Sequence, residues 1–345
     1  MVLKNIQLKS ILKKAITWGA FILLFLCSTQ SHAQQNIQLS QYIFNTISVN
    51  PAYTGYKDDW YFQMGHRQQW IGIDGAPTTT QLSVDGVTNP YTKNMGIGAQ
   101  FTSDKVGPQS ALSLYANYAY RLKLDNADMS RLCLGLAIGV TRYGTDLPLN
   151  PIDPADPILN LETQKSNYIP DVRFGLYYYN PKYYIGLSAM DLLSGNDSTS
   201  VWKFNTDSTN NSIRKIHFYL IGGTLLELSD EMKLRPSFMI REDFRGPTNI
   251  DLSALFVFDN RFWIGGSYRT GFQLWKNYTK NSKPLAISNA VIGIVNFQIS
   301  ERFRIGYSYD FSLNSLSNYQ NGTHELTIGW FLAGRSKRVL SPRFF

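Results

Sequence analysis

The sequence predicts a closed antiparallel β-barrel that spans an outer membrane with about 14 strands. Segments that alternate apolar and polar residues fill the chain from Asp59 to Gly334. This period of two is typical of strands whose two faces meet different surroundings. The connections between the segments alternate between short and long along most of the chain. Outer-membrane barrels have tight turns at one end and long loops at the other, so this sorting favours a barrel over a soluble sandwich.

The first 33 residues have the pattern of a secretory signal. Four lysines and no acid precede the apolar run Ala15–Cys27, which is too short to span a bilayer comfortably. Ser31 and Ala33 then supply the small residues that signal peptidase requires at positions −3 and −1. We expect cleavage after Ala33, so that residues 1–33 are removed and the mature chain begins at Gln34.

Composition after cleavage favours a membrane barrel over a nucleic-acid-binding or disulfide-stabilised protein. The formal charge is +8, and the four signal lysines account for half of it. The remaining basic residues are scattered, so we predict no nucleic-acid partner. Cys133 alone survives cleavage, which excludes an intrachain disulfide. A lipoprotein acylated at Cys27 is the alternative, but Leu26 stands where a small residue is required. The many aromatic residues suit girdles at the membrane interfaces, although an aromatic-rich soluble β protein would also contain them.

Fourteen segments have the length and alternation expected of strands in a bilayer. An even number of strands implies that both termini lie in the periplasm. One connection is irregular, because Lys105–Pro108 is short where a long outer loop is expected. The predicted strands are Asp59–Arg67, Thr78–Asp85, Lys93–Asp104, Gln109–Leu122, Asp128–Tyr143, Tyr168–Tyr179, Lys182–Leu193, Ile213–Leu228, Met232–Arg241, Thr248–Phe258, Arg261–Thr270, Ile287–Ile299, Arg302–Ser312 and Thr323–Gly334.

Most of these strands have one apolar face and one mixed face. In Arg131–Tyr143, for example, leucine, isoleucine and valine alternate with cysteine, glycine, alanine and threonine. Small residues suit a crowded lumen better than a solvated surface, so we predict that the apolar faces contact lipid. The segment Ile287–Ile299 is ambiguous, because apolar residues occupy both of its faces. The candidate lumen residues are Arg235, Arg241, Arg302, Arg304 and Asp310.

The sequence contains no convincing active site, so we predict no enzyme activity and no cofactor. Three histidines lie far apart without metal-ligand spacing: His66, His217 and His324. Three aspartates of one long loop offer oxygen ligands that suit calcium, but without an ordered spacing: Asp146, Asp153 and Asp156. Cys133 stands among small residues of the mixed face, and we interpret it as a space filler.

Two motifs near the start of the mature chain carry the clearest functional signal. The first joins Gln41–Asn45 to Asn50–Gly55, and the second joins Arg67–Gly72 to Asp74–Thr79. They resemble the amino-terminal signature of the PorP/SprF family, outer-membrane proteins of the type IX secretion system of Bacteroidetes. The terminal Ser341–Phe345 also resembles family members. The candidate signature or partner-contact residues are Gln41, Tyr42, Phe44, Asn45, Asn50, Pro51, Tyr53, Gly55, Arg67, Gln69, Trp70, Gly72, Asp74, Gly75, Pro77, Pro342, Arg343 and Phe345.

The resemblance implies a role in exporting or surface-anchoring large secreted proteins such as gliding adhesins. Its implied partners are outer-membrane lipid, other secretion components and a secreted substrate with a carboxy-terminal sorting domain. It leaves open whether the chain is a core component or serves one substrate. The motif residues also have an architectural interpretation, because Asn50-Pro51 and Asp74-Gly75 favour turns and Trp70 falls where the first strand leaves the bilayer.

Two further questions stay open from the sequence. An outer-membrane channel for small solutes is the alternative function, with the lumen arginines setting a preference for anions. Residues 34–58 precede the first strand, and they lie either in the lumen or across the periplasmic mouth. We assign residues 59–334 to the barrel and 335–345 to a periplasmic tail, which serves either barrel assembly or docking.

Overall fold

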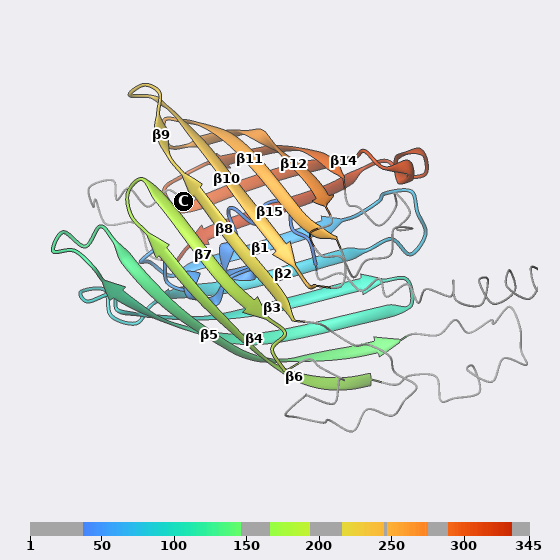
Figure 1. Ribbon diagram of the computed structural model, residues 1–345, viewed down its shortest axis with the longest axis horizontal. Coiled ribbons are helices and arrows are strands. Elements are labelled where there is room, and N and C mark those ends of the chain that lie inside the picture. Colours follow the sequence, from blue (N-terminus) through green and yellow to red (C-terminus); the bar gives the residue numbers. More distant parts are fainter. Residues whose placement is uncertain are drawn as a thin grey trace, which may run out of the picture. The chain divides into compact units, whose positions relative to one another are not determined.

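The computed structural model describes residues 37–145, 166–193, 216–244, 247–272, 274 and 289–332. In these residues, strands that follow one another in sequence pair antiparallel, and β15 pairs back with β1 (Figure 1). The short β9 continues β8 along the same partner, β10, so the two together form one strand of the wall. The result is a closed 14-stranded antiparallel barrel.

The wall consists of β1 (Tyr61–Gln68), β2 (Thr78–Val87), β3 (Met95–Val106), β4 (Gln109–Lys123), β5 (Arg131–Thr145), β6 (Ser166–Tyr179), β7 (Tyr183–Met190), β8 (His217–Thr224), β9 (Leu226–Glu227), β10 (Met232–Glu242), β11 (Thr248–Phe258), β12 (Phe262–Phe272), β13 (Ala290–Gln298), β14 (Phe303–Ser312) and β15 (Thr323–Phe331). Short 3-10 helices η1 (Thr46–Ser48) and η2 (Pro51–Tyr53) precede β1, and η4 (Ser315–Asn318) joins β14 to β15. The fourteen predicted strands are confirmed, with ends that shift by a few residues. The predicted last strand is too long, because β15 ends at Phe331.

The apolar faces point outward, as predicted. On β5, Leu136 and Ile138 are exposed by 46% and 58%, whereas Cys133 and Ala137 on the opposite face are 1% exposed. Closure leaves no unpaired strand edge, which a bilayer would penalise by several kcal/mol per unpaired backbone group. Among the described residues, no helix is both long enough and apolar enough to cross a membrane.

The ambiguous segment on β13 also has a defined orientation. Val291 and Val295 point outward, while Ile292 and Ile294 are buried in the lumen. Apolar residues occupy both faces because the lumen face of β13 packs against the buried cluster.

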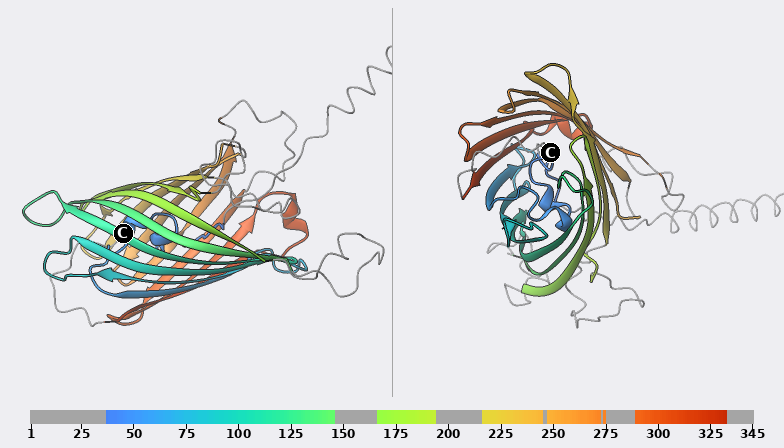
Figure 2. Two further views of the ribbon diagram at one scale, coloured as in Figure 1. Left: turned by 90° about the horizontal axis from the view of Figure 1, so that it is seen from below. Right: turned by 90° about the vertical axis from the view of Figure 1, so that its left-hand side faces the viewer.

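The two ends of the barrel differ in their connections. At the short-turn end, residues 124–130, 180–182 and 259–261 join neighbouring strands. At the long-loop end, residues 69–77 and 313–322 do so, and the irregular joint is a tight turn of Gly107 and Pro108. Gly107 has a φ of +55°, which favours glycine. Seen along the barrel, the amino-terminal segment lies inside the ring of strands (Figure 2, right).

Candidate interaction site in the barrel lumen

Residues 37–56, which we call the lumen segment, fill part of the barrel interior. Ile43, Phe44, Ala52 and Tyr53 are each exposed by 3% or less. The segment contains η1 and η2 but no strand, so it adds nothing to the wall. It forms the centre of a buried cluster to which the lumen faces of several strands contribute.

The Asn50-Pro51 pair fixes the turn at the middle of the segment. The Asn50 side-chain oxygen accepts a hydrogen bond from the Ala52 amide at 2.9 Å and so caps η2, with Pro51 at its first position. The Asn50 side-chain nitrogen donates to the carbonyls of Leu176 at 2.9 Å and Leu187 at 3.3 Å. One side chain therefore shapes the segment and anchors it to β6 and β7.

The segment runs through the lumen from the long-loop end to the short-turn end. At the long-loop end, the side-chain amide of Gln38 lies against Arg241 of β10. With this amide flipped, its oxygen accepts a hydrogen bond from the Arg241 guanidinium. At the short-turn end, the Gly55 amide donates to the Asp85 carboxylate at 2.8 Å. Asp58 follows, and its carboxylate pairs there with Lys93 and Arg121, both at 2.9 Å.

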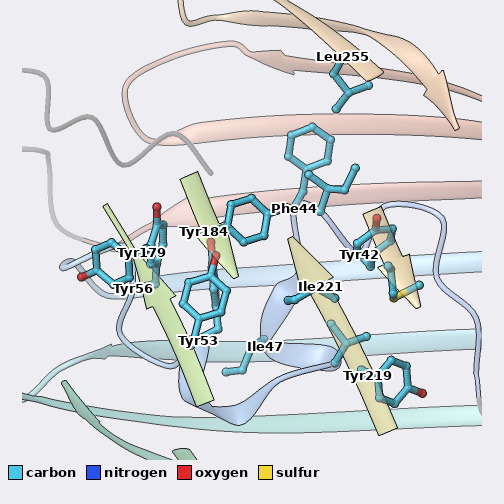
Figure 3. Close-up of a cluster of buried hydrophobic side chains, with 14 of the residues drawn as sticks. Tyr42, Phe44, Ile47, Tyr53, Tyr56, Tyr179, Tyr184, Tyr219, Ile221 and Leu255 are labelled. Carbon is cyan, nitrogen blue, oxygen red and sulfur yellow. The ribbon is translucent and has the colours of Figure 1, made fainter. Parts of the chain in front are cut away.

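Tyrosine and phenylalanine rings make up much of the contact between the segment and the wall (Figure 3). The rings of Tyr53 and Tyr56 stack with centroids 4.6 Å apart. Tyr56 meets Tyr179 of β6 edge-on at 4.7 Å, and Phe44 meets Trp263 of β12 at 6.2 Å. Such pairs contribute about 0.5–1.5 kcal/mol each beyond their area burial.

Glycines on the lumen faces make room for the segment. A Cβ at Gly135 of β5 would overlap the backbone of Pro51 and Ala52. A Cβ at Gly175 of β6 would overlap the Asn50 side-chain oxygen. The small residues of the mixed faces therefore form the surface on which the segment lies.

Five charged side chains surround the start of the segment near the long-loop end, and we call them the outer cluster: Arg67, Asp251, Arg269, Asp310 and Glu325. Arg67 pairs with Asp310 at 2.7 Å and with Glu325 at 3.0 Å. Arg269 pairs with Asp251 at 2.9 Å and with Asp310 at 3.4 Å. Each of the five residues is exposed by 3% or less.

The segment completes the outer cluster. The amides of Ser40 and Gln41 donate to the Glu325 carboxylate at 2.8 and 3.0 Å, and the Ser40 hydroxyl donates to Asp310 at 2.7 Å. Two arginines face three carboxylates, so these donors stabilise the additional negative charge. Buried charges require such partners, because isolated burial costs several kcal/mol.

The structure places four of the five predicted lumen residues on lumen faces. Arg235, Arg241 and Asp310 are buried, and Arg304 donates to the Phe44 carbonyl at 3.2 Å. The guanidinium carbon of Arg304 lies 4.9 Å from the centroid of the Phe44 ring. Arg302 does not face the lumen, because β14 begins at Phe303 and Arg302 lies in the exposed turn before it.

The first sequence motif makes up most of the lumen segment, whereas the second lies at the long-loop end. Gln41, Tyr42, Phe44, Asn45, Asn50, Pro51, Tyr53 and Gly55 are buried in the lumen. The Asn45 side-chain nitrogen donates to Gln81 of β2 at 2.5 Å. Gly55 has a φ of +76°, which favours glycine.

In the second motif, Arg67 belongs to the outer cluster, and the other candidate residues, from Gln69 to Pro77, lie in the connection between β1 and β2. The Gln69 amide donates to the Pro77 carbonyl at 2.9 Å, and the Trp70 amide donates to the Thr323 hydroxyl at 3.1 Å. Gly75 accepts from the Gly107 amide at 2.8 Å. Gly72 and Asp74 are exposed in the same connection. Pro342, Arg343 and Phe345 lie outside the described residues, as do Asp146, Asp153 and Asp156.

The three histidines lie apart from one another. His66 and His324 point outward and contact Thr80 and Tyr307 at 2.9 and 2.6 Å. His217 is buried with its ring 3.7 Å from the Asp191 carboxylate. Within the described part of the chain, no three histidine, cysteine, aspartate or glutamate side chains are grouped as metal ligands.

Sequence reasoning missed four residues that meet at the outer cluster: Ser40 of the segment and Asp251, Arg269 and Glu325 of the wall. The last three are charged residues on the mixed faces of predicted strands, and this position could have identified them as lumen residues from the sequence. Nothing in the sequence pairs them with Ser40, because they come from β11, β12 and β15.

A family model described as "Type IX secretion system membrane protein PorP/SprF" matches residues 31–330. A search of curated proteins finds no match to this sequence. Among solved structures, the chain is similar to the toluene transporter TbuX of Ralstonia pickettii, with 10% identity, 83% of this chain and 92% of that chain covered, and a TM-score of 0.49. It is also similar to a FadL homologue of Pseudomonas aeruginosa, with 10% identity, 82% and 93% covered, and a TM-score of 0.46. A third similar structure is Omp33 of Acinetobacter baumannii, with 8% identity, 79% of this chain and 99% of that chain covered, and a TM-score of 0.43.

Proposed function

Because the chain belongs to the PorP/SprF family of type IX secretion system membrane proteins, we propose that it is a non-enzymatic outer-membrane barrel that aids export or surface anchoring of large secreted proteins. The observation that carries this proposal beyond the family is the occupied lumen. The barrel's own amino-terminal segment occupies part of the lumen through which solutes would pass in a channel. Its partners are other secretion components and a secreted substrate with a carboxy-terminal sorting domain.

The lumen arginines support this proposal over a solute channel. In an anion-selective pore, arginines would face water and the passing ion. Here Arg67 and Arg269 pair with buried carboxylates, and Arg304 donates to the segment. These guanidinium groups hold the segment and the wall together, so they do not provide an anion path.

We propose that the short-turn end faces the periplasm and the long-loop end faces the cell surface, as in other outer-membrane barrels. β1 begins and β15 ends at the short-turn end. The lumen segment extends from there to the long-loop end at Gln38. We therefore propose that the carboxyl-terminal side of the barrel lies in the periplasm, while residues 1–36, which precede the segment, lie outside the described residues.

Deleting the gene and comparing secreted and cell-surface proteins by mass spectrometry tests the proposal. We expect large proteins with a carboxy-terminal sorting domain to be lost from the surface, and complementation with the full chain to restore them. Loss of one such protein would indicate a dedicated partner, and loss of many a core component. An unchanged set of secreted proteins, with impaired uptake of a small solute, would contradict the proposal in favour of a channel.

A further inference from the structure

The wall accepts hydrogen bonds from the main chain of the lumen segment at both of its ends. Glu325 accepts from two consecutive amides, those of Ser40 and Gln41, at 2.8 and 3.0 Å. Asp85 accepts from the Gly55 amide at 2.8 Å. Amides are common to all polypeptides, so these carboxylates recognise a chain in a given path rather than particular side chains.

The wall also donates to main-chain carbonyls between these ends. Arg304 donates to the carbonyl of Phe44 at 3.2 Å, and the Ser188 hydroxyl donates to the carbonyl of Val49 at 2.5 Å. Together with the acceptors, these donors line a path along which a non-strand peptide satisfies its backbone. A buried peptide that adds no strand needs such partners, because its backbone groups must still be hydrogen-bonded.

The charges of the outer cluster would remain paired if the segment left. Arg67 contacts Asp310 and Glu325, and Arg269 contacts Asp251, all within the wall. Departure of the segment removes neutral donors from these carboxylates but no countercharge. Water that enters the lumen can replace these neutral donors, so the outer cluster can stay hydrogen-bonded after the segment has left.

The aromatic contacts between the segment and the wall are also compatible with a lumen that holds either the segment or water. Tyr53 and Tyr56 of the segment meet Tyr177 and Tyr179 of the wall. Tyrosine combines an apolar ring with a hydroxyl that water can solvate, which leucine or isoleucine lacks. The segment is joined covalently to the wall only at β1, and it contributes no strand.

We propose that the lumen wall is a binding site for a polypeptide segment that contains turns, that residues 37–56 occupy it in the resting state, and that a segment of the secreted partner replaces them. The ligand is a peptide with a hydroxyl residue at the outer cluster, an aromatic residue beside Arg304, and an Asn-Pro-like turn over Gly135 and Gly175. This inference rests on the proposed function and names the site through which the partner would act.

Cys133 provides a native reporter for occupancy of this site. It is the one cysteine beyond the signal, since the chain has two and the other is Cys27. Its side chain is 1% exposed in the buried cluster that contains Tyr53 and Tyr56. Gly135, two residues further along β5, lies directly against Ala52. The rate at which N-ethylmaleimide labels Cys133 therefore reports whether the segment is in place.

The test uses the full chain with a protease site inserted between Asp59 and Trp60, which is cut after the barrel has folded in detergent. We expect slow labelling of Cys133 before cutting, and labelling about tenfold faster after cutting and washing, because the buried thiol becomes solvent-accessible. A synthetic peptide of residues 37–58 should restore slow labelling, and a scrambled peptide should not. Heat-modifiable migration in gels checks that the wall stays folded.

Two variants of the cut chain test the peptide contact itself. Glu325→Gln weakens the acceptor of the two amides. We therefore expect the Glu325→Gln variant to need a higher peptide concentration than the parent before the labelling of Cys133 becomes slow again. Glu301→Gln, in an exposed turn, should require the same amount as the parent. Labelling that stays slow after cutting, or that the peptide does not slow again, would overturn the inference while leaving the secretion experiment unaffected.

If the inserted protease site prevents folding, a variant without that site tests the same inference. Ser40→Pro in the intact chain removes both the amide and the hydroxyl that reach Glu325 and Asp310. We expect several-fold faster labelling of Cys133 in a barrel that still shows heat-modifiable migration. Labelling at the rate of the unaltered chain would count against an exchangeable segment.

Discussion

At the scale of residues, the lumen is organised by a few side chains that serve both the wall and the segment. Arg67 connects β1 to Asp310 on β14 and Glu325 on β15, and it also donates to the Ser40 hydroxyl at 2.9 Å. Charge-assisted hydrogen bonds of this kind are stronger than neutral ones when water is excluded. The outer cluster is therefore the part of the lumen most sensitive to single substitutions.

Arg67→Met should destabilise the barrel by about 3–5 kcal/mol, because it leaves two buried carboxylates without their main countercharge. The measurement is urea unfolding in detergent followed by tryptophan fluorescence. Arg302→Met is the matched control, since Arg302 is exposed in a turn, and it should change the free energy of unfolding by less than about 0.5 kcal/mol. Equal effects of the two substitutions would show that the outer cluster does not stabilise the fold.

Gly135→Ala should destabilise the protein by about 1–3 kcal/mol, because its Cβ would overlap Ala52 and push the segment off the wall. The same unfolding experiment measures it. Gly293→Ala is the control, because a Cβ there meets nothing within 4 Å. If Gly135→Ala were as harmless as Gly293→Ala, the close approach of segment and wall would be wrong.

At the scale of elements, the alternation of residues was sufficient to predict the strands. Each strand has an outward apolar face and an inward mixed face, and turn chemistry marks its ends. The interrupted strand is the exception, because the break at Leu225 between β8 and β9 leaves no mark in the alternation.

The lumen segment could not be placed from the sequence. It has no helical or strand period, and its partners are spread over strands from β2 to β15, so no local pattern identifies them. The same cause explains β13. Ile292 and Ile294 are apolar because they face the buried cluster, to which the segment contributes many of the residues. Of the site, Asp310 and three of the four arginines were predictable from charge on a mixed face.

The outward face of β5 allows a test of lipid contact at the scale of an element. Ile138→Arg, in the middle of the strand, should destabilise the barrel in lipid vesicles by about 2–4 kcal/mol, because arginine is costly near the bilayer midplane. Leu124→Arg, at the short-turn end, should cost about 0–1 kcal/mol. Reversible unfolding in vesicles measures both. Equal costs would contradict a lipid-facing β5.

At the scale of the whole molecule, the barrel has two apolar surfaces with different roles. The outer one is the surface that we propose contacts lipid, and the inner one is a buried core that the wall shares with residues 37–56. A wall of 14 strands encloses more space than its own side chains fill, so the segment supplies the missing packing. The protein is therefore held together as a membrane barrel outside and as a globular core inside.

Single-channel recording on the purified protein in planar bilayers tests this account most directly. The intact chain should show no steady open conductance, and a variant lacking residues 38–56 should conduct steadily, because the lumen then contains water. A steady conductance of the intact chain, equal to that of the shortened variant, would contradict the account, since the segment would then not close the lumen.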